Sequence, residues 1–332
     1  MYTLRRFIVM TLDPVHIGTG GYRLGRVDLS IVREPGTSLP KIPGTSLSGM
    51  VRSYAAIRYE KLRCAGQGQG ESEEKRHCGQ PTCPICYTFG TARGEAEGGN
   101  AGTVNVFDAR LLLFPVYSMA GPVWVTSPSV LADFGISEQE VNNAKARWTV
   151  SSQRFLNLGW LMVEKDGDDW QPPGELSNRV PDPVKSCIVL VSDKLFPQIV
   201  NSNLEVRTSV SIDPYTGAAR EGALFTYEAL PRSTFLWFDL VEDDYQRDPG
   251  TNQSRFPVTE RKCKTERRTD ANGNENISYK DNGGEELGEK WERPLDVVKA
   301  GLALSEYLGV GGMNTRGFGR MKIISGWEVK NG

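Results

Sequence analysis

The sequence lacks any uninterrupted apolar run of about 18 residues, the least that a membrane-spanning helix needs. Its first residues, Met1 to Arg6, include neither the apolar segment nor the small-residue cleavage site of a signal peptide. No internal repeat is present, which argues against a repeat architecture. From these absences we expect a cytoplasmic protein that makes no contact with a membrane.

A large excess of charge is also missing, because 39 Lys and Arg residues oppose 41 Asp and Glu residues and leave a net charge of −2. This balance argues weakly against a nucleic-acid partner, but the distribution of charge is more informative than its sum. Residues 1–58 hold eight basic and three acidic side chains, a local excess of five positive charges. Residues 241–290 hold nine basic and twelve acidic ones, which mask that excess. The N-terminal excess is compatible with phosphate binding and equally with a solvated surface.

Cysteine is scarce outside one cluster, since four of the six cysteines lie between residues 64 and 86. In a cytosolic chain, clustered cysteines indicate metal ligands before disulfides. The spacing Cys64-x13-Cys78-x4-Cys83-x2-Cys86, with His77 beside Cys78, predicts one tetrahedral structural zinc ion. Cys83 and Cys86 are the safest pair, the choice of four ligands among the five residues stays open, and free buried cysteines are the alternative. The remaining two cysteines are expected in an apolar strand and in a polar segment: Cys187 and Cys263.

The first 62 residues predict a strand, a glycine-rich loop, a second strand, a turn and a helix. Residues that favour strands occupy 2–12 and 27–33, on either side of the glycines of 18–25. Prolines and a glycine at 40–44 indicate a turn, and apolar residues at helical spacing predict a helix over 46–62.

Two insertions interrupt the rest of the chain. Residues 63–103 show no periodicity and hold the cysteine cluster, so they predict an inserted zinc-binding segment. Residues 243–290 are polar and rich in turn residues, and they predict a mobile insertion. The other expected elements are strands at 104–116, 122–127, 186–200, 234–241 and 320–329, a weak helix at 137–149 and a final helix that begins at Pro294. This order predicts an α+β fold with a ferredoxin-like (RRM-like) palm, formed by a single domain over residues 1–332.

A glycine-rich loop, residues 309–319, lies between the final helix and the last strand. A dinucleotide-binding fingerprint lies between a strand and a helix, so the context excludes a Rossmann interpretation. Glycines let a backbone approach a phosphate closely and direct several N–H groups at it, and Arg316 adds a positive charge. The alternative is a loop whose glycines serve only its turns.

Asp28 is a lone acidic residue among the basic residues of the N-terminal region. A carboxylate repels phosphate, so its presence there suggests a general base or a metal ligand. Surface solubility is the alternative, and composition alone favours it. His16 is the only other residue nearby that titrates near neutral pH.

Four segments resemble one protein family. They are "GRVDLSIVRE" at 25–34, "KIPGTSLSGMVRS" at 41–53, "FDARLLLFPV" at 107–116 and "GVGGMNTRGFGR" at 309–320. Together they resemble the RAMP superfamily, and within it the backbone subunits of type III CRISPR effector complexes, above all the Cmr-type subunit. The cysteine cluster followed by "YTFG" is more similar to the Csm-type subunit.

The resemblance implies an RNA-binding subunit that packs along a guide RNA with copies of itself and with other effector subunits. It implies a β-hairpin thumb, here residues 201–232, that wedges between bases and splays a nucleotide of the paired target RNA. It also implies that Asp28 is catalytic, in a cleavage that depends on Mg²⁺ or another divalent ion, with a ribose 2′-hydroxyl attacking the adjacent phosphate. A non-catalytic scaffold of the same fold and a zinc-stabilised binding module without nuclease activity remain alternatives.

The residues that we expect to bind RNA come from the N-terminal region, the thumb and the glycine-rich loop. They are Arg23, Lys41, Ser46, Ser48, Arg52, Tyr215, Arg220, Gly311, Gly312, Arg316 and Gly317.

Overall fold

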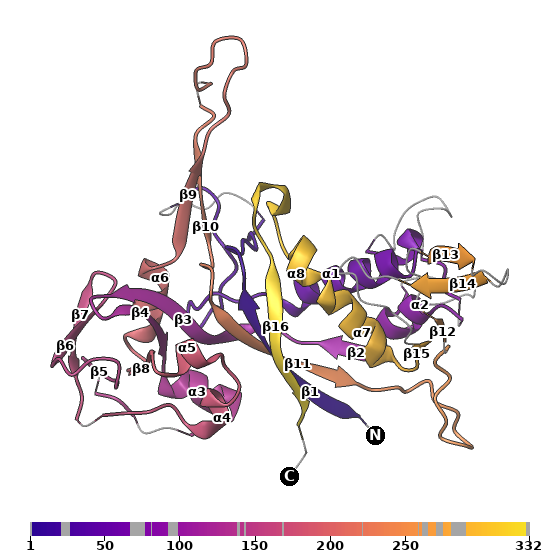
Figure 1. Ribbon diagram of the computed structural model, residues 1–332, viewed down its shortest axis with the longest axis horizontal. Coiled ribbons are helices and arrows are strands. Elements are labelled where there is room, and N and C mark those ends of the chain that lie inside the picture. The colour runs from indigo at the N-terminus through magenta and orange to yellow at the C-terminus, as the bar shows by residue number, and fades with distance from the viewer. Residues whose placement is uncertain are drawn as a thin grey trace.

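The structure is a computed structural model (Figure 1). It describes residues 2–20, 27–66, 77–80, 82–91, 99–137, 140–142, 144–167, 169–220, 222–257, 259–260, 265–269, 275–279 and 290–329. The chain has a mixed α+β architecture built around one large, mostly antiparallel sheet of ten strands. Among the described residues, no helix is both long and apolar enough to cross a bilayer.

One half of the sheet contains the two chain termini and is covered by two helices. Its strands follow the order β16-β1-β11-β2, and each neighbouring pair is antiparallel. The strands are β1 (Thr3–Thr11), β2 (Val104–Val106), β11 (Phe235–Glu242) and β16 (Met321–Glu328). The helices are α1 (Gly44–Arg58) and α7 (Pro294–Ala303). In chain order this half therefore runs β1-α1-β2-β11-α7-β16.

Alternate side chains place two cores on the two faces of this half. Phe7 and Val9 of β1 join the core beneath α1 and α7, whereas Ile8 joins the core on the opposite face. The two helices pack closely because Gly301 faces Val51, and a Cβ atom at Gly301 would collide with the Val51 carbonyl oxygen.

The other half of the sheet continues from β11 through β3, β4, β8, β5, β7 and β6. Only the pairs β4–β8 and β5–β7 are parallel. The strands are β3 (Arg110–Ser118), β4 (Gly121–Thr126), β5 (Lys145–Arg147), β6 (Phe155–Leu158), β7 (Leu161–Lys165) and β8 (Ile188–Val191). Four short helices pack on this half: α3 (Pro128–Phe134), α4 (Gly174–Ser177), α5 (Asp182–Lys185) and α6 (Phe196–Ser202).

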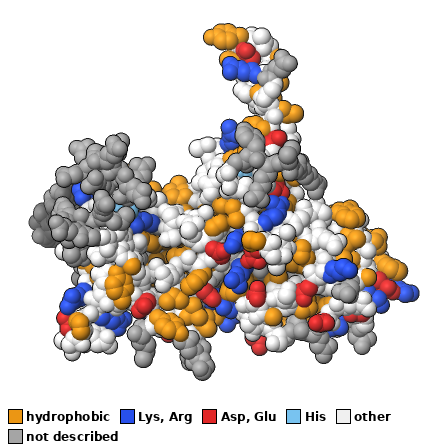
Figure 2. Space-filling view, turned by 180° about the vertical axis from the view of Figure 1, so that it is seen from behind, with side chains coloured by type: hydrophobic (Ala, Val, Ile, Leu, Met, Phe, Trp, Pro, Cys, Tyr) orange, Lys and Arg blue, Asp and Glu red, His pale blue; other side chains and the backbone are white. Residues whose placement is uncertain are grey.

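The predicted thumb hairpin, residues 201–232, contains two antiparallel strands, β9 (Glu205–Ser209) and β10 (Phe225–Ala229). It projects far beyond the body of the molecule (Figure 1), and the space-filling view shows it standing clear from behind (Figure 2). The residues between the strands are mostly exposed, and the Tyr215 side chain near the end is 96% exposed. The hairpin can therefore contact a partner with both of its sides.

The cysteine-containing insertion packs at the end of the helical layer. It contains a 3₁₀ helix, η1 (Leu62–Cys64), and the helix α2 (Pro84–Phe89). A third core lies between α1, α2 and α7 and includes Phe256 and Trp291. The predicted polar insertion 243–290 thus contributes a buried aromatic residue at Phe256. The remaining elements are β12 (Thr259–Glu260), β13 (Thr265–Thr269), β14 (Glu275–Tyr279), β15 (Lys290–Trp291), α8 (Ser305–Leu308) and η3 (Asn314–Arg316).

Three secondary-structure predictions need correction. The segment 27–33 forms isolated bridges with several different partners instead of a regular strand. The weak helix at 137–149 is wrong, because its described part contains the short strand β5. The predicted strand 186–200 ends at Val191, and the helix α6 follows. The predicted helix over 46–62 is confirmed, although α1 begins two residues earlier and ends at Arg58.

Candidate functional site

Asp28 lies at the base of the thumb hairpin and is bound to strand β10. Its Oδ2 accepts hydrogen bonds from the Thr226 backbone N–H at 2.7 Å and from the Thr226 hydroxyl at 2.9 Å. These two bonds, the backbone one first, hold the pKa of Asp28 below its ordinary value. Its Oδ1 has no hydrogen-bond partner among the other described residues. Asp28 is therefore an exposed carboxylate with a fixed orientation and one oxygen left for a ligand.

A partly buried ion pair fixes β10 two residues further along the strand, at Glu228. Glu228 accepts from both terminal nitrogens of Arg33, at 2.9 and 2.6 Å, and from the Ile31 backbone N–H at 3.1 Å. Arg33 also donates from Nε to the Asn201 side chain at 2.9 Å. A buried carboxylate is stable only when its charge is paired, so this network locks the 28–33 segment onto the hairpin.

His16 is buried beside these residues and contacts the hairpin through its ring. Its Nδ1 donates to the Glu228 carbonyl oxygen at 2.7 Å, and its ring meets Tyr227 edge-on at 6.1 Å. Nε2 faces Gly18, where a Cβ atom would approach it to 3.1 Å. With 5% of its surface exposed, His16 supports the site instead of contacting a ligand directly.

The glycine-rich loop 309–319 packs against this hairpin base. The Gly312 backbone N–H donates to the His16 carbonyl oxygen at 2.9 Å. Gly311 has a φ of 82° and lies so close to the backbone of His16 that a side chain at this position would not fit. Phe318 is buried against Tyr227 and Leu29. The loop, the Asp28 segment and the hairpin base thus share one small core.

Two arginines lie over aromatic rings of this core and direct positive charge to the surface. The Arg207 guanidinium carbon lies 4.8 Å from the centre of the Phe318 ring, and that of Arg316 lies 5.9 Å from the Phe225 ring. Arg316 is exposed and has no ion pair among the described residues, whereas Arg207 pairs with Glu205 at 2.6 Å. We call the group Asp28, Thr226, Arg207, Arg316 and the 309–319 loop the hairpin-base site.

The other residues predicted to bind RNA lie at several places. Tyr215 and Arg220 are exposed near the end of the thumb hairpin, away from the hairpin-base site. Gly317 ends η3 with a φ of 79°, and open space surrounds its Cα. Arg23 falls outside the described residues.

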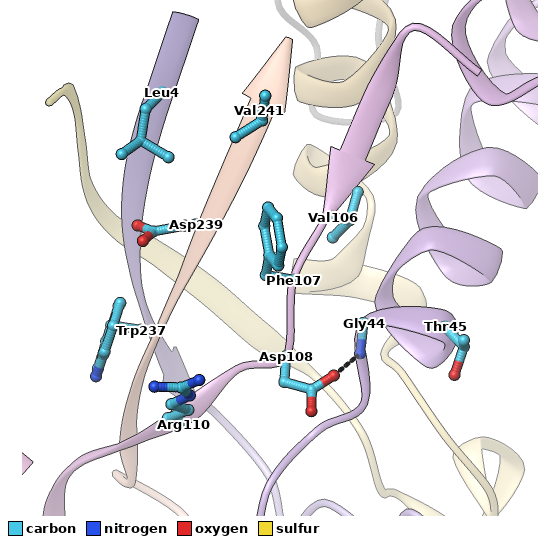
Figure 3. A pocket seen from close by; sticks show the side chains of 10 residues that line it. All are labelled: Leu4, Gly44, Thr45, Val106, Phe107, Asp108, Arg110, Trp237, Asp239 and Val241. Atoms are coloured by element: carbon cyan, nitrogen blue, oxygen red, sulfur yellow. Dashed lines mark hydrogen bonds between the residues drawn. The ribbon is translucent and has the colours of Figure 1, made fainter. Parts of the chain in front are cut away.

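The start of α1 adjoins a cavity that is lined also by β1, β11 and residues 106–110 (Figure 3). Lys41 is ion-paired with Asp108, which also accepts the Gly44 backbone N–H at 2.7 Å and so caps the helix. The cavity measures about 510 Å³, and its wall includes Phe107 and Trp237. Ser46 and Ser48 are half-buried in the first turns of α1.

The four cysteines of the cluster meet in a buried group. Their Sγ atoms all lie within 4.8 Å of one another. Three of the pairs are separated by 3.7 to 3.8 Å: Cys78–Cys86, Cys64–Cys83 and Cys64–Cys86. Four sulfurs at about 2.3 Å from a tetrahedral zinc ion lie about 3.8 Å apart, so the geometry fits such an ion. The donor set is closed, which indicates a structural role.

His77, the fifth candidate ligand, is occupied elsewhere. Its Nδ1 lies 2.9 Å from Nη2 of Arg52 and its Nε2 lies 2.7 Å from the Ala65 carbonyl oxygen. A carbonyl oxygen can only accept and a guanidinium can only donate, so Nε2 carries the proton and Nδ1 accepts. Both ring nitrogens are used, which leaves the four cysteines as the candidate ligand set.

Arg52 lies beneath the cysteine cluster instead of on an RNA-facing surface. Its Nε donates to the Cys64 carbonyl oxygen at 2.8 Å, and its Nη1 donates to the Gly90 carbonyl oxygen at 2.9 Å. Only 9% of its surface is exposed. The structure therefore does not support the prediction that Arg52 binds phosphate.

Sequence reasoning missed the residues that position Asp28, namely Thr226, Glu228 and Arg33. A signal was present, because Glu228 interrupts an otherwise apolar end of a strand and Arg33 follows an apolar pair. A buried charge in such a position indicates a partner of opposite sign. The partner itself could not be named without knowing that segments almost 200 residues apart meet.

Comparison with known proteins agrees with this geometry. Residues 9–322 match the RAMP superfamily. The chain is 30% identical over 253 residues, 70% of its length and 78% of the relative's, to the CRISPR system Cmr endoribonuclease Cmr4 of Pyrococcus furiosus. The chain therefore belongs to the RAMP superfamily.

Solved structures share the fold over nearly the whole chain. A chain from the cryo-EM structure of the apo state of Type III-B Cmr-beta has a TM-score of 0.59 at 15% identity, covering 97% of this chain and 98% of that one. The crystal structure of oligomeric Cmr4 from Pyrococcus furiosus has a TM-score of 0.57 at 20% identity, with 99% of each chain covered.

Proposed function

We propose that this chain is a backbone subunit of a type III CRISPR ribonucleoprotein, which binds guide RNA and cleaves the paired target RNA endonucleolytically. The observation that carries the proposal is the hairpin-base site, where a fixed carboxylate, a glycine-rich loop and an exposed arginine meet beneath a projecting hairpin. Phosphates need cations and backbone N–H groups, and strand cleavage needs a positioned base or metal ligand. The relative named Cmr endoribonuclease Cmr4 supports the same activity.

The fold supports the assignment of a ferredoxin-like palm. The chain order β1-α1-β2-β11-α7-β16 and the sheet order β16-β1-β11-β2 match a split βαβ arrangement. The insertion at 63–103 would be held by a zinc ion on Cys64, Cys78, Cys83 and Cys86, which would cross-link the short helices η1 and α2 with the segment that carries Cys78. The four thiols would leave the ion no free position.

In the cleavage that we propose, Asp28 acts at the 2′-hydroxyl of a splayed target nucleotide. Thr226 holds Oδ2, which fixes the orientation of the carboxyl group and therefore the position of Oδ1. The pKa of Asp28 lies below its ordinary value, so the side chain is a carboxylate at neutral pH and can hold a divalent ion or accept the proton of the hydroxyl. A Mg²⁺ ion bound by one carboxylate and by RNA phosphate would stabilise the charge that develops on the phosphate.

Arg316→Ala should weaken guide RNA binding equally for all sequences, because phosphate contacts carry no base information. We expect the slope of log affinity against log salt concentration to become shallower by about 0.7, the contribution of one contact to single-stranded RNA. Fluorescence anisotropy at several salt concentrations measures both quantities. Arg154→Ala, an exposed arginine next to β6 at the far end of the sheet, is the matched control. An unchanged slope in Arg316→Ala would show that Arg316 makes no contact with phosphate.

Tyr215→Ala should leave guide RNA binding unchanged and slow target cleavage by about tenfold or more, since base–aromatic stacking contributes about 1–3 kcal/mol per base. The ring stands free at the end of the thumb hairpin, where it can enter a base step as a wedge. Cleavage of a labelled target by the assembled complex measures the rate and the positions of the cuts. Tyr117→Ala removes another exposed tyrosine, on β3, and serves as the control. If Tyr215→Ala cuts at the wild-type rate and positions, Tyr215 is not the residue that enters the base step.

A further inference from the structure

Arg52 contacts every segment that supplies a cysteine to the metal centre. Its guanidinium binds the carbonyl oxygen of Cys64 and the ring of His77, the residue directly before Cys78. It also binds the carbonyl oxygen of Gly90, whose backbone N–H is bonded to Cys86 at the end of α2. A guanidinium is planar and its donors have fixed directions. Arg52 of α1 therefore contacts all three segments that carry the cysteines and sets their relative positions.

No carboxylate among the described residues balances the charge of Arg52. Among the described residues its hydrogen-bond partners are carbonyl oxygens and a neutral imidazole, and it forms no ion pair. A buried cation is costly unless an opposite charge lies close by. Arg52 is buried and lies close enough to all four cysteines to interact with each of them electrostatically. Four thiolates around a divalent ion carry two net negative charges, which is the missing counter-charge.

Lys61 supplies a second positive charge at the same centre. Its side chain is half-buried, is hydrogen-bonded to Cys78 and lies near Cys83 and Cys64. Arg52 and Lys61 together therefore balance the two net negative charges of a tetrathiolate site that holds a divalent ion. His77 completes the arrangement, since its ring connects Arg52 to the Ala65 carbonyl oxygen beside Cys64.

We propose that Arg52 is a positioning residue of the metal centre, which aligns the three cysteine-bearing segments and, with Lys61, neutralises the bound thiolate–metal group. The inference rests on the proposed structural metal site. It reassigns Arg52 of the "KIPGTSLSGMVRS" motif from contact with RNA to positioning of the metal ligands. It also makes α1 the element that connects the metal centre to the main core, because the neighbouring Val51 is buried in that core.

The test measures zinc affinity of the full chain by competition with a chromogenic chelator. Arg52→Gln should bind zinc about 10- to 100-fold more weakly than wild type, the usual loss when an outer partner of a metal ligand is removed. Arg52→Lys keeps the positive charge but cannot contact all three segments. Its zinc affinity should lie between those of wild type and Arg52→Gln. Lys61→Gln should weaken binding, whereas Arg63→Gln, which removes an exposed neighbouring cation, should leave affinity unchanged. Cobalt substitution adds a spectroscopic readout, because the thiolate-to-Co²⁺ absorption reports the coordination geometry.

Each outcome decides a different question. A wild-type chain that binds neither zinc nor cobalt overturns the metal site itself. A wild-type chain that binds one ion, together with an Arg52→Gln variant of equal affinity and identical cobalt spectrum, overturns the role of Arg52 alone. Should Arg52→Gln be recovered only as aggregate, Arg52→Lys and Lys61→Gln decide: unchanged affinity in both refutes the proposal, and weakened affinity in both, with Arg63→Gln unaffected, supports it.

Discussion

Asp28→Ala abolishes measurable cleavage of target RNA by the assembled complex while the guide and target stay bound. We expect the single-turnover rate in the presence of magnesium to fall by about 10²–10⁴-fold, the usual contribution of a positioned acid–base group. The reason is that Asp28 is an ionised carboxylate held by Thr226, with one oxygen free at the base of the thumb hairpin. Asp28 is the only carboxylate among the described residues that form the hairpin-base site, and the neighbouring Glu228 is paired with Arg33.

Matched variants separate the charge of Asp28 from its position. Asp28→Asn keeps the size of the side chain and should be as slow as Asp28→Ala if the negative charge is needed. Thr226→Val removes one of the two groups that lower the pKa of Asp28, so the acid limb of the pH–rate profile should move to higher pH. Asp133→Asn, an exposed carboxylate on α3, should leave cleavage unchanged. Undiminished cutting by Asp28→Ala would instead identify the chain as a non-catalytic scaffold.

Replacing Cys83 and Cys86 by serine has the largest expected effect on stability. Structural zinc sites contribute about 10–16 kcal/mol of apparent binding free energy in small domains, as much as the total stability of many proteins. We expect the double variant to bind no zinc and to lose hydrogen-exchange protection in α2. The reason is that the cysteines lie inside the core that holds α2 against α1 and α7. Elemental analysis, thermal unfolding and hydrogen exchange measure these effects.

Cys187, the fifth cysteine, offers a contrast within the same chain, whereas Cys263 lies outside the described residues. Cys187→Ser alters a half-buried cysteine that lies outside the cluster, so its zinc content and melting temperature should stay close to wild type. Treatment of the wild-type chain with a chelator should reproduce the double-serine variant. Full metal occupancy in Cys83→Ser with Cys86→Ser would reject the four-cysteine ligand set.

Much of the fold could be predicted because its signals are local and repeated. The strands that became β1 and β11 consist of long runs of β-branched and aromatic residues, and the structure confirms both. Pro294 begins α7 as expected, since proline fits the first turn of a helix. The cysteine spacing predicted that these residues would meet, and the structure brings all four together. It did not predict the hydrogen bonds that occupy both ring nitrogens of His77.

The failures have a common physical cause, which is that tertiary contacts set the conformation. Segment 27–33 has strand-like residues, but its bridges go to Tyr227, Gly18 and Pro40 in turn, so it does not continue as a ladder. Arg52 stands beside the apolar residues of α1 and resembled a surface cation. The neighbouring small residues Ala55 and Ala56 were a sign that this face is covered, and the structure shows both fully buried in the third core.

The most direct test of the central claim is equilibrium binding of the purified wild-type chain to guide RNAs of increasing length. If the chain is a backbone subunit, it binds at moderate salt, its affinity falls as salt rises, and the number of bound copies increases with guide length. A chain that shows no binding to guide RNA at moderate salt, although it is folded and contains its metal, would contradict the proposed function and favour a zinc-stabilised module with another partner.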